Sequence, residues 1–204
     1  RVTARDRARL SAYIERLAAA RPAALNRAEQ MAFWINLYNA LTVRVVLDHY
    51  PVMSIRDIDI SPGFLADGPW GAPLVAVDGT DVSLNDIEHR ILRPLWRDPR
   101  VHYAVNCASL GCPDLAARPY AAGDLEARLD TAARAYVNHP RGAAVKDGRL
   151  VVSSIYVWFG GDFGGDDGVL AHLRQYAEPA LAGALAAVTA IGDHRYDWGL
   201  NDAP

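Results

Sequence analysis

The most constraining feature of the sequence is a long apolar segment, residues 31–47, in which apolar side chains surround a helix axis on every side. Asn26 is well placed to cap this helix, and Glu29 three residues later completes a capping-box pattern. Pro51 lies just beyond the end of the segment and stops it. Because a helix that is apolar all round is stable only when it is covered, the pattern predicts a central, buried helix.

Two amides interrupt this segment, Asn36 and Asn39, which are three residues apart and therefore lie on one face of the helix. A buried amide must find hydrogen-bond partners or it destabilises the core. Either these amides tie the helix to neighbouring loops, or they contact a ligand directly. Tethering is the more common role of a buried amide, and we favour it.

The rest of the chain alternates between helical and hairpin patterns. Asp-Gly pairs at residues 78–79 and 147–148 each stand between two short β-favouring runs, a strong hairpin signal. Helical patterns follow at residues 4–20, 84–92, 124–138, 169–177 and 180–190, and residues 191–201 resemble a strand or a cap over the core. No repeat or linker divides the chain. The sequence predicts one α+β domain over residues 1–204, with buried N-terminal helices packed on a mainly antiparallel sheet.

Composition and charge limit the class of function. The 204 residues carry a net charge of −3, which argues against non-specific nucleic-acid binding, and no apolar run is long enough to span a membrane. Two cysteines do not form a disulfide framework in a chain of this length. The chain starts at Arg1 rather than Met, as expected for a processed or trimmed chain. We expect no nucleic-acid partner and no membrane insertion, and the oligomeric state is left open.

Both cysteines, Cys107 and Cys112, lie in residues 100–113, where apolar and polar residues alternate and then give way to Gly-Cys-Pro. The pattern predicts a strand that enters a tight turn. Such a turn holds a thiol rigidly and leaves it accessible; the alternative is that Cys107 is a small buried apolar residue. A disulfide between the two cysteines would silence any thiol chemistry. In a regular strand, residues five apart face opposite ways, so His102 is expected to point away from Cys107.

Glu88 stands on the apolar stripe of the predicted helix 84–92, where a carboxylate is unusual without a partner. It either pairs with Arg90 or Arg93 as a structural ion pair or has a functional role. His89 is next to it and is the better candidate to serve Cys107 as a base. Further along, the glycine-rich and acidic residues 160–167 suggest either a loop that closes over a site or an ordinary connector.

Nucleophilic catalysis requires a thiolate, a base and a group that orients the base. Cys107, either His89 or His102, and Glu88 supply these residue types. A zinc site made of the two histidines and the two cysteines is a weaker alternative, because the cysteine spacing is wide and no second pair exists. We therefore expect no metal and no cofactor.

Several segments together resemble one family. They are residues 32–40, 83–93, 102–109 with Cys112-Pro113, and 196–201. Over about residues 28–201 the chain resembles the bacterial and plant family called domain of unknown function 547. The resemblance implies a site like that of cysteine peptidases or transglutaminases, with Glu88, His89 and Cys107 at motif positions and the order of His and Cys permuted. Bacterial members are often exported, so a periplasmic or extracellular location is an open expectation.

These observations lead to one functional hypothesis. The protein is expected to be a cysteine-dependent hydrolase or acyltransferase that acts on an amide, of peptide or γ-glutamyl type. Cys107 attacks, His89 takes its proton, Glu88 orients or charges the histidine, and Asn106 or a turn N–H stabilises the oxyanion. His102 is the reserve base. The alternatives are a non-catalytic module that binds a peptide or metabolite, and a Cys/His metal-binding domain.

Overall fold

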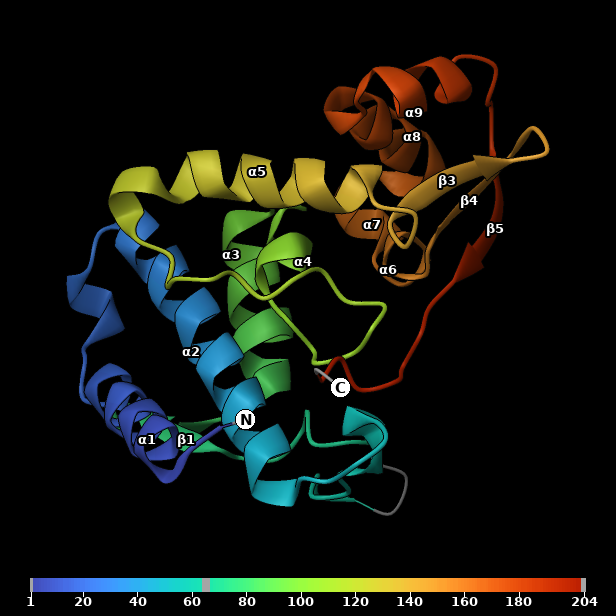
Figure 1. Ribbon diagram of the computed structural model, residues 1–204. Coiled ribbons are helices and arrows are strands. Elements are labelled where there is room, and N and C mark those ends of the chain that lie inside the picture. The colour runs from blue at the N-terminus through green and yellow to red at the C-terminus, as the bar shows by residue number, and fades with distance from the viewer. Residues whose placement is uncertain (1, 64–66, 203–204) are drawn as a thin grey trace.

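The computed structural model describes residues 2–63 and 67–202. Its centre is helix α2 (Arg27–His49), which begins as the sequence predicts: Asn26 accepts hydrogen bonds from two backbone N–H groups, and Glu29 accepts one from the Asn26 N–H. Twelve residues of α2 are buried. Helix α1 (Ala4–Ala18) packs beside it and buries only Ile14 (Figure 1). The prediction of a central, buried α2 is confirmed.

The remaining elements are short apart from two helices. In chain order they are η1 (Pro22–Ala24), η2 (Ile55–Asp57), β1 (Val75–Val77), β2 (Thr80–Val82), the π-helix η3 (Asp86–Leu92), α3 (Arg93–Trp96), α4 (Val101–Ala104), η4 (Ala122–Asp124), α5 (Leu125–Asn138), β3 (Ala143–Lys146), β4 (Arg149–Ser153), α6 (Ile155–Trp158), α7 (Gly160–Phe163), α8 (Gly165–Tyr176), α9 (Pro179–Leu185) and β5 (Ile191–Arg195).

The strands form two small, separate sheets. In the first, β1 pairs with β2 antiparallel; in the second, β4 pairs antiparallel with β3 and parallel with β5. Both Asp-Gly turns have positive φ at both central residues, as the tight turns of hairpins require. The α+β class and mainly antiparallel pairing are confirmed. The expectation that the buried N-terminal helices pack on a sheet is wrong for α2, which packs chiefly against other helices, whereas α1 also contacts β1 (Figure 1).

Residues 101–104 form helix α4, so the prediction of a strand before Cys107 is wrong. Asp98 explains the difference, because its carboxylate accepts the Arg100 N–H and its carbonyl accepts the Val101 N–H, which starts a helical turn. All four residues of α4 are buried. In a buried run this short, the hydrophobic pattern does not distinguish a helix from a strand. The chain becomes extended only at Val105. The argument that His102 must face away from Cys107 therefore fails.

The glycine-rich segment is also more regular than expected. Residues 160–163 form α7, and α8 begins at Gly165, after a tight turn in which Gly164 and Gly165 both have positive φ. Phe163 is buried and anchors the segment to the core. This segment is thus a packed helical corner. In the same region the last helix, α9, ends at Leu185 rather than at residue 190.

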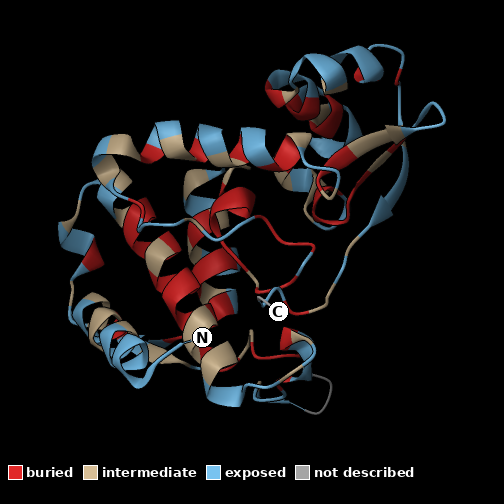
Figure 2. Ribbon diagram, in the orientation of Figure 1, coloured by how far each residue is buried: buried red, intermediate tan, exposed pale blue. Residues whose placement is uncertain are grey.

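The buried residues, red in Figure 2, gather in two main clusters. One surrounds α2, η3 and α4, and the other lies between α5, the three-stranded sheet and α8. A third, small cluster joins the end of α2 to Ala108 and Leu200. None of the helices in residues 2–63 and 67–202 combines the length and apolar character that crossing a membrane requires.

Candidate active site

Helix α2 holds the turn that carries the cysteines through the side chain of Asn39. Asn39 donates to the Ala104 carbonyl and accepts the Asn106 N–H, both at 2.8 Å. The Asn106 side chain in turn donates to the Pro113 carbonyl and accepts the Ala108 N–H. Ala108 has a φ of 58°, the left-handed conformation that this sharp turn needs. The backbone around Cys107 is therefore fixed by two buried amides.

The C-terminal segment clamps the same turn from its other side. The Leu110 N–H donates to the Gly199 carbonyl and the Gly111 N–H to the Asp197 carbonyl, at 2.7 and 2.8 Å. Gly111 has to be glycine here, since a Cβ would stand 2.9 Å from the Asp197 nitrogen. This pairing brings Tyr196, 89 residues away in the chain, to the Cys107 sulfur.

Three groups surround the Cys107 sulfur: Tyr196 Oη and Cys112 Sγ at 2.9 Å, and Ser109 Oγ at 3.2 Å. Ser109 donates to Tyr196 Oη, which leaves the Tyr196 hydroxyl proton free to point at sulfur. The hydrogen bond with Cys112, opposed by burial and aided by Ser109 and Tyr196, lowers the pKa of Cys107 to about 7. Burial raises the pKa of Cys112. Cys107 is therefore the sulfur that ionises.

Glu88 reaches the opposite wall from the π-helix η3. Ser83 and Asp86 form reciprocal hydrogen bonds at its start. Glu88 is only 7 % exposed, and its Oε1 lies 3.8 Å from His102 Nδ1 and 4.0 Å from His89 Nδ1. The arginines expected to pair with it are engaged elsewhere, Arg90 with Asp86 and Arg93 with Asp162. The basic side chains nearest to Glu88 are therefore the two histidines.

His102 is the better-held of the two imidazoles. It is 3 % exposed, stacks on Phe159 with ring centres 4.3 Å apart, and places Nε2 at 2.8 Å from Asp162 Oδ2. His102 and Arg93 hold the pKa of the Asp162 carboxyl well below its usual range. Each ring nitrogen of His102 thus faces a carboxylate. In contrast, Arg93 lies 3.1 Å from His89 Nδ1, and because a guanidinium only donates, that nitrogen carries no proton.

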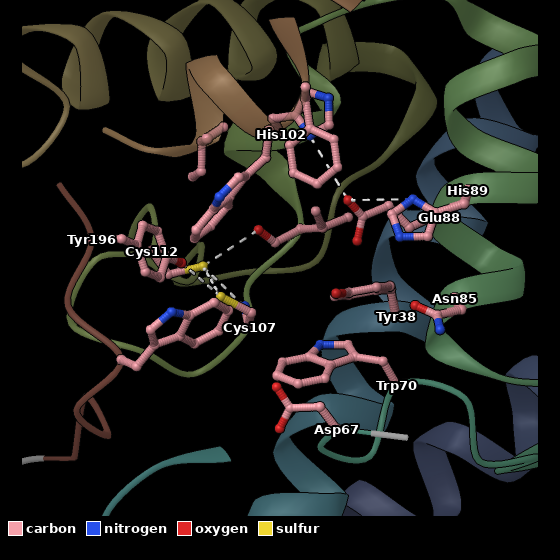
Figure 3. Close-up of a pocket in the computed structure, with 15 residues that line it drawn as sticks. Tyr38, Asp67, Trp70, Asn85, Glu88, His89, His102, Cys107, Cys112 and Tyr196 are labelled. Atoms are coloured by element: carbon pink, nitrogen blue, oxygen red, sulfur yellow. Dashed lines mark hydrogen bonds and ion pairs between the residues drawn. The ribbon is translucent and has the colours of Figure 1, made fainter. Parts of the chain in front are cut away.

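A pocket of about 240 Å³ separates the cysteine turn from Glu88 and the two histidines. Figure 3 shows Cys107, Cys112 and Tyr196 on one side, Glu88 and His102 on the other, and the Tyr38 hydroxyl pointing into the space between. Neither imidazole hydrogen-bonds to the Cys107 sulfur within the described residues. The pocket is strongly aromatic; its rings are those of Tyr38, Trp70, Trp158, Phe159, Tyr196 and Trp198.

The structure brings together most of the residues that the sequence singled out. Cys107, Cys112, Glu88, His89 and His102 all line the pocket. The three asparagines have structural partners instead: Asn36 exchanges two hydrogen bonds with the Tyr120 backbone, and Asn39 and Asn106 hold the cysteine turn. The tethering interpretation of Asn36 and Asn39 is confirmed. In residues 2–63 and 67–202, no three His, Cys, Asp or Glu side chains are grouped closely enough to bind a metal.

Sequence reasoning missed Tyr38, Asp162 and Tyr196 as members of the site. Asp162 lies in the glycine-rich segment and Tyr196 in the predicted C-terminal cap, so both segments had been singled out but not these side chains. Their partners are 60 and 89 residues away, at His102 and Cys107, and only the tertiary fold joins them. Tyr38 was hidden among the apolar residues of α2, where a tyrosine is an ordinary core residue.

The comparisons with known proteins identify the family. A family model described as "Protein of unknown function, DUF547" matches residues 22–137. That range holds α2, η3 and the cysteine turn and leaves out Asp162 and Tyr196. No curated protein and no solved structure matches the chain. Because the match covers more than half of the sequence, the chain belongs to the DUF547 family of proteins of unknown function.

Proposed function

We propose that the protein is a cysteine-dependent hydrolase or acyltransferase that acts on an amide bond, of peptide or γ-glutamyl type. The observation that carries the proposal is the arrangement across the pocket: the Cys107 thiol faces a Glu88–His102–Asp162 array over a space large enough for a small amide substrate. A nucleophile and an oriented acid–base group on two sides of one pocket are the parts that acyl transfer needs.

The first half of the reaction uses the thiolate of Cys107. Tyr196 and Cys112 stabilise it through hydrogen bonds, and Ser109 supports the Tyr196 hydroxyl by donating to it, so the thiolate needs no histidine in direct contact. Sulfur attacks the carbonyl carbon, and the C–S bond forms as the carbonyl oxygen becomes an oxyanion. His102, held between Glu88 and Asp162, gives a proton to the amine as the C–N bond breaks. The product is a thioester on Cys107 and a free amine.

The second half resolves the thioester. His102, now lacking the proton it donated, accepts one from water or from an acceptor amine as that group attacks the thioester carbon. The C–S bond breaks and the Cys107 thiolate is restored. Water gives hydrolysis and an amine gives acyl transfer. This assignment uses His102 rather than His89, because His102 is buried and fixed by two carboxylates.

Tyr38 and Trp70 supply the oxyanion donors in this proposal. The groups expected for that role are occupied: the Asn106 amide holds the turn, and the Cys107 N–H donates to Cys112 Sγ. Burial and then the charge of Glu88 raise the pKa of Tyr38 well above its ordinary value, so its hydroxyl stays protonated. Both Tyr38 and Trp70 line the pocket (Figure 3), and the Trp70 indole N–H has no acceptor among the described residues.

A fluorogenic amide library tests the proposal. We would offer N-acetyl dipeptide and γ-glutamyl amides of aminomethylcoumarin and look for repeated turnover. We expect release that Cys107→Ala abolishes and that His102→Gln lowers about 100-fold or more, the scale of a lost general acid–base. His49→Gln, at the end of α2, is the matched control. If no amide is turned over and no thioester forms on Cys107, the non-catalytic binding module becomes the better description.

A further inference from the structure

We propose that Cys107 and Cys112 form a reversible dithiol–disulfide couple, in which Cys107 reduces a small hydroperoxide and the disulfide that follows closes the nucleophilic site. The thiol-peroxide chemistry stands on the two cysteines alone. Only the regulatory consequence, the blocking of acyl transfer, rests on the proposed function.

The first observation is the contact between the two sulfurs. Both cysteines are free, and their sulfur atoms lie 2.9 Å apart. A disulfide requires a sulfur separation of about 2.05 Å, so the atoms must approach by only about 0.9 Å. The Cys107 N–H also donates to Cys112 Sγ at 2.9 Å and so holds that sulfur in place beside Cys107. The turn itself is clamped by the C-terminal segment, which keeps both residues in register.

The second observation is that the two thiols are not equivalent. Both cysteines line the pocket, but Cys107 is partly exposed there, whereas Cys112 is only 3 % exposed. A small oxidant entering the pocket therefore meets Cys107 first. The Tyr196 hydroxyl, to which Ser109 donates, lies next to the same sulfur and is placed to hydrogen-bond the oxygen that departs. This is the division between an attacking thiol and a resolving thiol.

The chemistry balances with a hydroperoxide as the oxidant. The Cys107 thiolate attacks the outer oxygen, an S–O bond forms, the O–O bond breaks, and the departing alkoxide or hydroxide is protonated by water. Cys112 sulfur then attacks the sulfenic sulfur; the S–S bond forms, and the hydroxide that leaves takes the Cys112 proton and departs as water. Two thiols lose two electrons in total, and the hydroperoxide gains them. A soluble dithiol reverses the step by thiol–disulfide exchange.

The consequence for the proposed function is direct. A sulfur in a disulfide is no nucleophile, so oxidation stops acyl transfer and reduction restores it. Closing the bond also holds the Cys107 sulfur against Cys112, on the side of the pocket opposite Glu88 (Figure 3). Without Cys112, the sulfenic acid on Cys107 has no resolving thiol and persists, and only excess peroxide carries it on to sulfinic acid, which dithiols do not reverse.

The experiment uses the full chain and hydrogen peroxide as the probe. Samples are quenched in denaturant with N-ethylmaleimide and digested with trypsin; no Lys or Arg separates the two cysteines, so both lie in one peptide. We expect that peptide to lose two hydrogens and to bind no maleimide, and dithiothreitol to restore both thiols. Cys112→Ser should instead accumulate a sulfenic acid on Cys107 that dimedone traps, and Cys107→Ser should leave Cys112 unoxidised.

Several results would overturn the couple. Wild-type protein that gains sulfinic acid at Cys107 while Cys112 still binds maleimide would do so, as would a disulfide found only between two chains on a non-reducing gel. The wild-type result does not depend on any variant folding. The two proposals also fail separately: amide turnover without the intramolecular disulfide removes only the redox couple, and the disulfide without amide turnover removes only the acyl-transfer proposal.

Discussion

The Tyr196 hydroxyl offers the sharpest test of how the thiol is activated. Tyr196→Phe removes one hydrogen bond to the Cys107 sulfur, made at 2.9 Å. The phenyl ring retains the packing of Tyr196 against Trp158 and Trp198, whose ring centres lie 4.9 and 4.8 Å away. The substitution therefore isolates the hydroxyl from the aromatic wall that surrounds it.

The expected magnitude follows from the charge of the acceptor. A hydrogen bond to an ionised group stabilises it by about 1.5–3 kcal/mol, and one pKa unit corresponds to about 1.4 kcal/mol. Ser109, released from Tyr196, turns toward sulfur and replaces part of the lost bond, which favours the lower end of this range. We expect the pKa of Cys107 to rise by about one unit from its value of about 7. The thiolate fraction at pH 7 then falls from about one half to about one tenth.

Iodoacetamide alkylation measured across pH supplies the assay. The rate at Cys107, followed by mass spectrometry, gives a midpoint for each variant, and fragmentation of the peptide separates Cys107 from Cys112. Tyr176→Phe is the matched control, because it removes a tyrosine hydrogen bond to Asp130 in the second core, away from the pocket. A Tyr196→Phe midpoint equal to that of the wild type would refute activation by hydrogen bonding, and so would a wild-type midpoint near 8.5, the value of a free thiol.

Four further predictions use other parts of the site and core. Glu88→Gln should lower amide turnover at least about tenfold. The alkylation midpoint of Cys107 should stay level or fall, because the Glu88 charge raises the pKa of that thiol. A large drop in melting temperature with unchanged turnover would assign Glu88 to stability alone. Tyr38→Phe should lower the acylation rate by about 100-fold if its hydroxyl stabilises the oxyanion, with no change in the alkylation midpoint larger than that of a control variant. Burial lowers the pKa of His172 to about 4, so on acidification the unfolded chain binds a proton before the folded protein does, and stability falls as the pH drops from 6.5 toward 4. Urea unfolding should show that the free energy of unfolding decreases by about 2 kcal/mol between pH 7 and pH 5, and His172→Gln should remove this decrease. Protein purified without chelator should carry well under one zinc per chain, and stoichiometric zinc that disappears in Cys112→Ser would support the metal-site alternative.

For Glu88→Gln, the structure reverses the direction of the change in the Cys107 pKa that the sequence predicts. From the sequence, Glu88 was expected to charge His89 beside the thiol, so its loss would weaken the thiolate. The structure places the pocket between Glu88 and Cys107, with no imidazole bonded to the sulfur within the described residues. The remaining interaction is repulsion between the Glu88 carboxylate and the Cys107 thiolate, so removing the Glu88 charge favours the thiolate.

Local sequence patterns predicted the local structure well. The capping box of α2, both Asp-Gly hairpins and the tethering role of Asn39 all depend on residues close in the chain or on a single buried amide. The same reasoning failed at α4, where four buried residues suit a strand or a helix equally and the Asp98 carboxylate decided between them. It also could not join His102 to Asp162 or Cys107 to Tyr196, because those contacts span 60 and 89 residues and exist only after the chain has folded.

The clamp on the cysteine turn has a consequence for the order in which the site matures. Cys107 is synthesised 89 residues before Tyr196, whose hydroxyl contacts its sulfur, and the backbone groups that pin its turn also lie in residues 196–201. A nascent chain can bury α2 and shape the turn before that segment emerges, yet Cys107 then lacks one of its hydrogen-bond donors. The full set of hydrogen-bond donors around the Cys107 sulfur is therefore assembled only when residues 196–201 dock against the cysteine turn.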